Sequence, residues 1–271
     1  MSVISEIFSY SFLTRAVCVG ILVSLCSALL GVSLVLKRFS MIGDGLSHVG
    51  FGSLSIAIAV GAAPLQVSVP VVIISAFLLL RLNKNSRLKG DSAIAVISSS
   101  ALAIGVIVTS LSSGLSADLC NYMFGSILAM SKSDVYLSII LSVTVLVIFI
   151  LCYNRIFAIT FDEDFAAATG THSNIYTMIL AVLTAVTIVV GMRLMGTLLI
   201  SSLIIFPALT SMRIFRNFKS VMISSALISI VCFFFGIVTS YVYSTPAGAS
   251  IVAVNLAMLI IFSIAGKLMK R

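Results

Sequence analysis

Charged side chains are scarce in this sequence of 271 residues, which has 16 lysines and arginines and 8 aspartates and glutamates. Charged residues make up 9% of the chain, whereas soluble proteins carry about 25%. Hydrophobic residues make up 61%, and the mean hydropathy is +1.26. So few charges cannot cover the surface of a soluble globule, and they also argue against a secreted, disordered or DNA-binding protein. The chain is therefore predicted to be an integral membrane protein.

Motifs for thiol and nucleotide chemistry are also missing. The five cysteines form no CxxC pair and have no adjacent histidine, which excludes a thiolate metal cluster and a disulfide framework. The only Gly-Lys pair, Gly266-Lys267, lacks the preceding glycine and the following serine or threonine of a phosphate-binding loop. We therefore expect that this chain does not hydrolyse ATP. Its loops are also too short for a separately folded catalytic domain.

The sequence predicts an all-α fold of eight or nine transmembrane helices. A helical span takes about 20 apolar residues, and nine apolar stretches are present, some of them short. An eight-span arrangement results if one of the first three stretches does not cross, and a short surface helix is expected at Ala117–Met130. The stretches are Phe12–Leu36, Leu46–Val60, Leu65–Leu80, Ala93–Leu111, Val135–Leu151, Ile175–Gly191, Leu194–Met212, Val221–Tyr241 and Ala249–Ala265.

The basic residues favour one orientation in the cell membrane. Cytoplasmic loops are enriched in lysine and arginine. If nine spans alternate and the N-terminus is outside, only Arg15, Lys132 and Arg193 lie outside, and the other thirteen basic residues lie inside. This asymmetry accounts for the net charge of +8 without nucleic acid and predicts a cytoplasmic C-terminus. Because no basic residue precedes Arg15, we expect the first apolar run to be retained rather than cleaved as a signal peptide.

The first polar cluster is the glycine-rich segment from Gly43 to Gly52. Asp44 and His48 are four residues apart, so a helix would place a carboxylate beside an imidazole. This pair suits divalent ions such as zinc, manganese or ferrous iron. The alternative is structural: Asp44 caps the helix and His48 bonds to a neighbouring helix. Gly50 and Gly52 are candidates for a helix break, or for close helix packing.

The second cluster is acidic and lies on the predicted cytoplasmic side. Asp162, Glu163 and Asp164 precede an alanine-rich turn that ends at Gly170, a pattern typical of a short helix. Composition alone favours a solvated loop, and a docking helix for a cytoplasmic partner is the alternative.

The third cluster is the segment from Gly196 to Ala208. Pro207 removes a backbone donor within an apolar run, so the helix is expected to kink or to end early. Ser201 and Ser202 either bond back to the helix backbone or line a polar path.

These clusters, in this order, resemble the permease subunit of the zinc, manganese and iron ABC importer family, often called the ABC-3 family. The resemblance extends over nearly the whole chain. It rests on Gly43-Asp44, Leu46-Ser47-His48, Asp91-Ser92-Ala93-Ile94, Ala101-Leu102-Ala103-Ile104-Gly105, the segment Met123–Ala129, the loop Phe161–Gly170 and the segment Gly196–Pro207.

The resemblance implies a function and a set of partners. Residues 1–271 would form one permease domain that works as a homodimer, each copy docked on a cytoplasmic ABC ATPase and supplied by an extracytoplasmic metal-binding protein. The transported ion would be zinc, or alternatively manganese or iron. Asp44 and His48 would lie on the metal path, with Gly50, Gly52, Gly196 and Pro207 as break or gating positions. Coupling to the ATPase would involve Phe161, Asp162, Glu163, Asp164, Phe165, Ala166 and Gly170.

Two other classes of function stay open at the level of sequence. A gradient-driven carrier could use Asp44 and His48 as a proton relay. An intramembrane enzyme is disfavoured, because no second ligand motif or nucleophile accompanies the pair.

Overall fold

The structure is a computed structural model that describes residues 11–85, 90–112 and 132–269. These residues form helices joined by short turns, with no strand in the described ranges, which confirms the predicted all-α class. The expected surface helix at Ala117–Met130 lies outside the described residues. The helices are α2 (Ser11–Leu36), α3 (Met41–Ala59), α4 (Pro64–Asn85), α5 (Gly90–Leu111), α7 (Lys132–Leu151), α8 (Tyr153–Phe161), α9 (Glu163–Ala168), α10 (Ser173–Met195), α11 (Thr197–Met212), α12 (Phe218–Tyr243) and α13 (Ala247–Met269).

Fewer helices qualify as spans than the eight or nine predicted. Within the described residues, six helices are long and apolar enough to cross a bilayer: α2, α5, α7, α10, α12 and α13. The apolar stretches of α4 and α11 are shorter, at Pro64–Leu79 and Leu199–Met212. In α3, the residues Asp44 and His48 and three serines lower the hydropathy of an otherwise apolar helix. The predicted number therefore counted polar and short helices as full spans.

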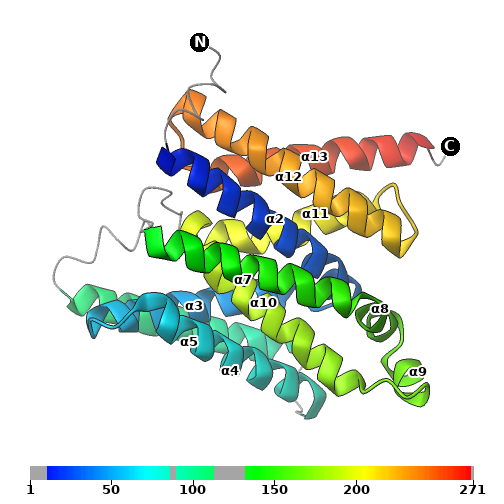
Figure 1. Ribbon diagram of the computed structural model, residues 1–271, viewed down its shortest axis with the longest axis horizontal. Coiled ribbons are helices and arrows are strands. Elements are labelled where there is room, and N and C mark those ends of the chain that lie inside the picture. Colours follow the sequence, from blue (N-terminus) through cyan, green and yellow to red (C-terminus); the bar gives the residue numbers. More distant parts are fainter. Residues whose placement is uncertain (1–10, 86–89, 113–131, 270–271) are drawn as a thin grey trace.

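The helices form two groups joined by a central helix (Figure 1). One group is α3, α4 and α5, in which α3 packs against both α4 and α5. The other is α2, α11, α12 and α13, and α10 contacts members of both groups. α3 ends at Ala59 and α4 begins at Pro64, so a short turn connects these two packed helices. α3, which carries Asp44 and His48, thus belongs to one group and contacts α11 of the other group.

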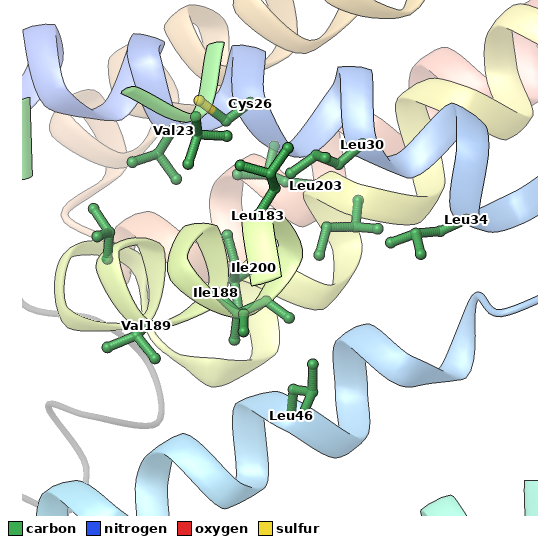
Figure 2. Packing of buried hydrophobic residues seen from close by; sticks show 14 of the residues in the cluster. Val23, Cys26, Leu30, Leu34, Leu46, Leu183, Ile188, Val189, Ile200 and Leu203 are labelled. Carbon is green, nitrogen blue, oxygen red and sulfur yellow. The ribbon is translucent and has the colours of Figure 1, made fainter. Parts of the chain in front are cut away.

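A continuous apolar core connects the two groups. Figure 2 shows side chains of α2, α10 and α11 pointing toward one another, with Leu46 of α3 turned toward the same core. The side chains of Val23, Leu46, Ile188, Ile200 and Leu203 are completely buried. Between helices in a bilayer such side chains stabilise the bundle through van der Waals packing rather than through transfer from water, so this packed core fixes α3 relative to α11.

The chain bends sharply at the end of the bundle that carries α8 and α9. Cys152 separates α7 from α8, and Asp162, in an extended conformation, separates α8 from α9. Tyr153, Phe157 and Phe161 of α8 pack near Phe218 at the start of α12, with ring centroids 5.1–5.7 Å from that of Phe218. These contacts anchor α8 and position the short α9 at the edge of the molecule (Figure 1).

Candidate functional site

Asp44 and His48 lie on one face of the first half of α3, as their spacing predicted. His48 Nε2 is 3.7 Å from Asp44 Oδ2. The Asp44 side chain is 42% exposed and that of His48 is 19% exposed. The separation exceeds the length of a hydrogen bond, so the pair leaves both atoms available to a ligand.

Asp44 is not the residue that caps α3. Ser40 occupies the N-cap position, and Asp44 lies in the first turn of the helix, which begins at Met41. A carboxylate in the first turn interacts favourably with the positive end of the helix dipole. The alternative that Asp44 caps the helix is therefore wrong, and Asp44 stabilises α3 only through its interaction with the helix dipole.

A hydroxyl from a second helix reaches the same carboxylate. Ser201 Oγ of α11 is 3.4 Å from Asp44 Oδ1 and also 3.3 Å from the carbonyl of Thr197. The Nδ1 atom of His48 is buried and has no hydrogen-bond partner among the described residues. The site is thus a carboxylate that accepts from one hydroxyl, beside an imidazole whose Nε2 faces that carboxylate and whose Nδ1 has no hydrogen-bond partner in the described part of the chain.

The start of α11 is set by a single glycine. Gly196 has φ +83° and ψ 164°, and it alone separates the end of α10 at Met195 from the start of α11 at Thr197. L-residues with a side chain rarely adopt this conformation. Gly196 therefore turns the chain so that the first turns of α11, including Ser201, lie beside the first half of α3.

Two predictions about helix breaks need correction. α3 runs without interruption through Gly50 and Gly52, both buried, so neither glycine breaks the helix. A Cβ atom on Gly52 would lie 2.6 Å from the carbonyl oxygen of Ala101. Glycine at this position instead allows α3 and α5 to approach closely. At Pro207 the predicted alternatives were a kink and an early end, and the early end is wrong, because α11 continues to Met212.

The acidic loop forms a capped helix. The side chain of Asp162 accepts a hydrogen bond of 2.9 Å from the backbone N–H of Phe165, as an N-cap does. α9 then spans Glu163–Ala168, Ala166 is completely buried, and Gly170 has φ +83°. A short helix with a glycine stop was predicted here, and the structure contains one.

α9 is tied to two other parts of the bundle. Lys37, directly after α2, lies 3.4 Å from Glu163 Oε2 and donates a hydrogen bond of 3.2 Å to Thr177 of α10. The Lys37 side chain is only 7% exposed. Arg155 of α8 donates a hydrogen bond of 2.8 Å to Thr171, in the connection between α9 and α10. α9 is thus held against the turn that leads from α2 into α3.

The outer surface of this region is aromatic. The Phe161 side chain at the end of α8 is 60% exposed, and that of Phe165 in α9 is 66% exposed. Phe161 and Phe165 are thus exposed apolar side chains beside the acidic residues at the start of α9.

Sequence reasoning missed two residues that complete these arrangements. Ser201 was predicted either to bond back to its own helix or to line a polar path, and Lys37 was only one of the thirteen basic residues assigned to the inner side. Their partners lie 157 and 126 positions away in the chain. No local pattern could have identified either pairing.

The described residues contain no cluster of three or more histidine, cysteine, aspartate or glutamate side chains that could hold a metal ion. Asp44 and His48 are a pair, not a closed cage. His172, the second histidine of the sequence, is exposed at the start of α10. One copy of the chain therefore brings together two side chains of types that bind metal ions, Asp44 and His48.

Comparisons with known proteins agree on one family. Residues 9–266 match the family described as the ABC 3 transport family. The chain is 31% identical over 243 residues to the "High-affinity zinc uptake system membrane protein ZnuB" of Haemophilus influenzae, covering 90% of this chain and 93% of that protein. It is 29% identical over 249 residues to the "Manganese transport system membrane protein MntC" of Halalkalibacterium halodurans, covering 92% and 85%.

A solved structure has the same fold. It is described as "PsaBC from Streptococcus pneumoniae in complex with Fab". The TM-score is 0.86 with 27% sequence identity, and the match covers 96% of this chain and 94% of the other.

Proposed function

Because the chain belongs to the ABC 3 transport family, we propose that it is the membrane permease of an ATP-driven importer of divalent metal, with zinc as the substrate. The whole chain acts as one permease domain in the cell membrane, with its N-terminus outside and its C-terminus in the cytoplasm. The observation that carries the proposal is the Asp44–His48 pair, open to a ligand and braced by Ser201.

The geometry of this pair suits a metal ion. Zinc lies about 2.0–2.2 Å from carboxylate oxygen and imidazole nitrogen, so two of its ligands in a tetrahedral site are about 3.4 Å apart. The observed separation of 3.7 Å is close to this value. A small inward rotation of either side chain brings both atoms into the zinc shell.

The ligand types favour zinc over the other candidates. Imidazole nitrogen with carboxylate oxygen is a common zinc donor set, whereas manganese prefers more oxygen ligands and octahedral geometry. Relatives named for zinc and for manganese both occur. The preference for zinc therefore rests on the histidine, and manganese or iron are the alternative substrates.

The number of ligands supports a dimer. A tetrahedral zinc site takes four ligands, and one chain offers two. We propose that two copies of the permease face each other, so that the same pair on the second copy completes the coordination. Opening of the interface then separates the two pairs and releases the ion, which a closed four-ligand cage in one chain would not allow.

The energy source is proposed to be a cytoplasmic ATPase that docks on α9. The exposed Phe161 and Phe165 would fill an apolar pocket of that subunit, and Asp164 would pair with its basic residues. Movement of α9 would reach α3 through Lys37, which bonds Glu163 and lies four residues before α3 begins. An extracytoplasmic metal-binding protein would deliver the ion on the other side.

Zinc uptake by intact cells tests the metal site. Cells without their own high-affinity zinc uptake would express the permease with its partner subunits, and accumulation of radioactive zinc would be measured. We expect Asp44→Asn and His48→Ala each to lower uptake at least about tenfold, since even loss of an outer-shell partner of a metal ligand costs about 10–100-fold.

The chain offers a matched control for the histidine. His172→Ala removes the other histidine, which is exposed at the start of α10. We expect wild-type uptake from this variant at equal protein levels. Wild-type uptake by both Asp44→Asn and His48→Ala would contradict the proposed site, and stronger competition by manganese than by zinc would contradict the assigned substrate.

A further inference from the structure

A groove unrelated to the metal site runs between α2, α7 and α12. It has a volume of about 460 Å³, within the range of ligand-binding pockets. α2 lies between α7 and α12 in Figure 1, and Leu25 and Leu29 of α2 line the groove together with Phe149 of α7 and Leu227 of α12. All three helices are candidate spans, so the groove lies along the membrane-facing part of the molecule.

The groove has one polar end. Tyr153 and Lys219 line it where α8 begins and α12 begins, and the rest of the lining is apolar. Lys219 is exposed, and no carboxylate pairs with it in the described part of the chain. Arg213 and Arg216 lie exposed in the adjacent turn before α12. This end of the groove is therefore positively charged, and its opposite end is hydrocarbon-like.

This shape and charge match an amphiphile with a negative headgroup. An acyl chain fits an apolar channel between helices, and a phosphate is attracted to an unpaired lysine at the membrane interface. Tyrosine is enriched at that depth because its ring is apolar and its hydroxyl is polar. The exposed Ile150, Ile223 and Leu227 extend the apolar rim of the groove. A soluble anion would gain nothing from these apolar walls.

We propose that this groove binds an anionic glycerophospholipid, with one acyl chain along α2 between α7 and α12 and the phosphate at Lys219 and Tyr153. The proposal goes beyond metal transport and requires only that these helices lie in a bilayer. Tyr153 is the first residue of α8, which leads into α9. A bound lipid would therefore brace the element that carries the proposed docking helix.

Native mass spectrometry on the detergent-purified, delipidated permease tests the proposal. The protein would be titrated with phosphatidylglycerol and with phosphatidylcholine that carry the same acyl chains. We expect the wild type to prefer phosphatidylglycerol, and Lys219→Ala to weaken its binding about fivefold, the effect of one lysine near a charged membrane surface. Lys267→Ala, an exposed lysine on α13, is the matched control and should leave the preference unchanged.

A second variant tests the apolar part independently of charge. Ala226 lines the groove, and Ala226→Trp should fill it and lower the binding of both lipids, whereas Ile260→Trp on the exposed face of α13 should not.

Equal binding of the two lipids by the wild type, or unchanged binding by Lys219→Ala, would overturn the proposal. So would crosslinking between two copies through Leu227→Cys, because a second copy would then occupy the groove. Loss of zinc uptake in Asp44→Asn with lipid binding intact would keep this inference separate from the proposed function.

Discussion

Gly52 lies at the closest approach of α3 and α5, and its missing side chain is what allows that approach. A Cβ atom there would meet the backbone carbonyl of Ala101 at 2.6 Å, and a backbone atom cannot move away as a side chain can. A Cβ atom on Gly105, on the facing helix, would meet the Phe51 ring at 2.7 Å and the Cα atom of Gly52 at 3.0 Å. The two glycines let the helices pack almost backbone to backbone.

Gly52→Ala is therefore expected to separate α3 from α5 and to lower the free energy of unfolding by about 1–3 kcal/mol, the usual cost of overpacking. Thermal unfolding of the purified protein in detergent would measure this change. Gly43→Ala, in the same helix, is the matched control, since its new methyl would meet only the flexible end of Ile204 at 3.2 Å. Equal stability of the two variants would show that the α3–α5 contact is not as close as described.

Residue patterns indicated part of the site and could not indicate the rest. The spacing of Asp44 and His48 predicted their shared face, because the period of a helix fixes it. The same pattern could not place Ser201 beside Asp44, since that contact depends on how α11 packs against α3. Nor could it show whether Gly50 and Gly52 break α3 or allow close packing, because glycine does both.

Among the elements, α9 is linked by a charged contact to the turn after α2, which is distant in the sequence. Its Glu163 pairs with the nearly buried Lys37, and Lys37 also bonds Thr177. Loss of one partner from a charged hydrogen bond leaves the other poorly solvated. The turn from α2 into α3 thus cannot move independently of α9 without breaking this contact.

Lys37→Met and Glu163→Gln should each uncouple α9 from α3. We expect fewer zinc ions transported per ATP hydrolysed, and a free energy of unfolding lower by about 1–2 kcal/mol. Simultaneous measurement of zinc flux and phosphate release in reconstituted vesicles gives the number of zinc ions transported per ATP hydrolysed. The double variant with Lys37→Glu and Glu163→Lys is the control, because it restores a pair of opposite charges, and it should recover part of the wild-type ratio. A wild-type ratio in both single variants would rule out this pair as the connection.

The exposed Phe165 of α9 is the residue that we propose contacts the ATPase. An aromatic anchor at an interface centre commonly contributes 2 kcal/mol or more, so Phe165→Ala should weaken binding of the ATPase at least about tenfold. Quantitative co-purification in detergent measures the effect. Phe235→Ala removes a similarly exposed phenylalanine of α12 and should leave ATPase binding unchanged. If both variants bind normally, the docking surface lies elsewhere.

At the scale of the whole molecule, the number and order of the apolar helices were predicted well from the sequence. Which of these helices are long and apolar enough to cross the membrane was predicted less well. Long apolar runs identify helices, because a lipid-facing backbone must satisfy its own hydrogen bonds. The second, third and seventh predicted segments are helices as well, α3, α4 and α11, but polar residues or short apolar stretches distinguish them from the six clear spans. These are also the elements that carry or adjoin the candidate metal site.

The arrangement gives a physical account of metal transport. α3 and α11 carry polar groups inside an otherwise apolar bundle, where such groups are costly and mark a pathway. The turn before α3 is bonded to α9 through Lys37, so one short contact connects the proposed ATPase surface to the proposed metal helix. A gradient-driven carrier would need no such surface.

The most direct test is zinc uptake into vesicles that contain the purified permease together with its ATPase and binding protein. The account predicts uptake that requires ATP, persists when an uncoupler collapses the proton gradient, and disappears in Asp44→Asn and His48→Ala. Uptake without ATP that collapses with the uncoupler would contradict it, and would identify the Asp44–His48 pair as a proton relay.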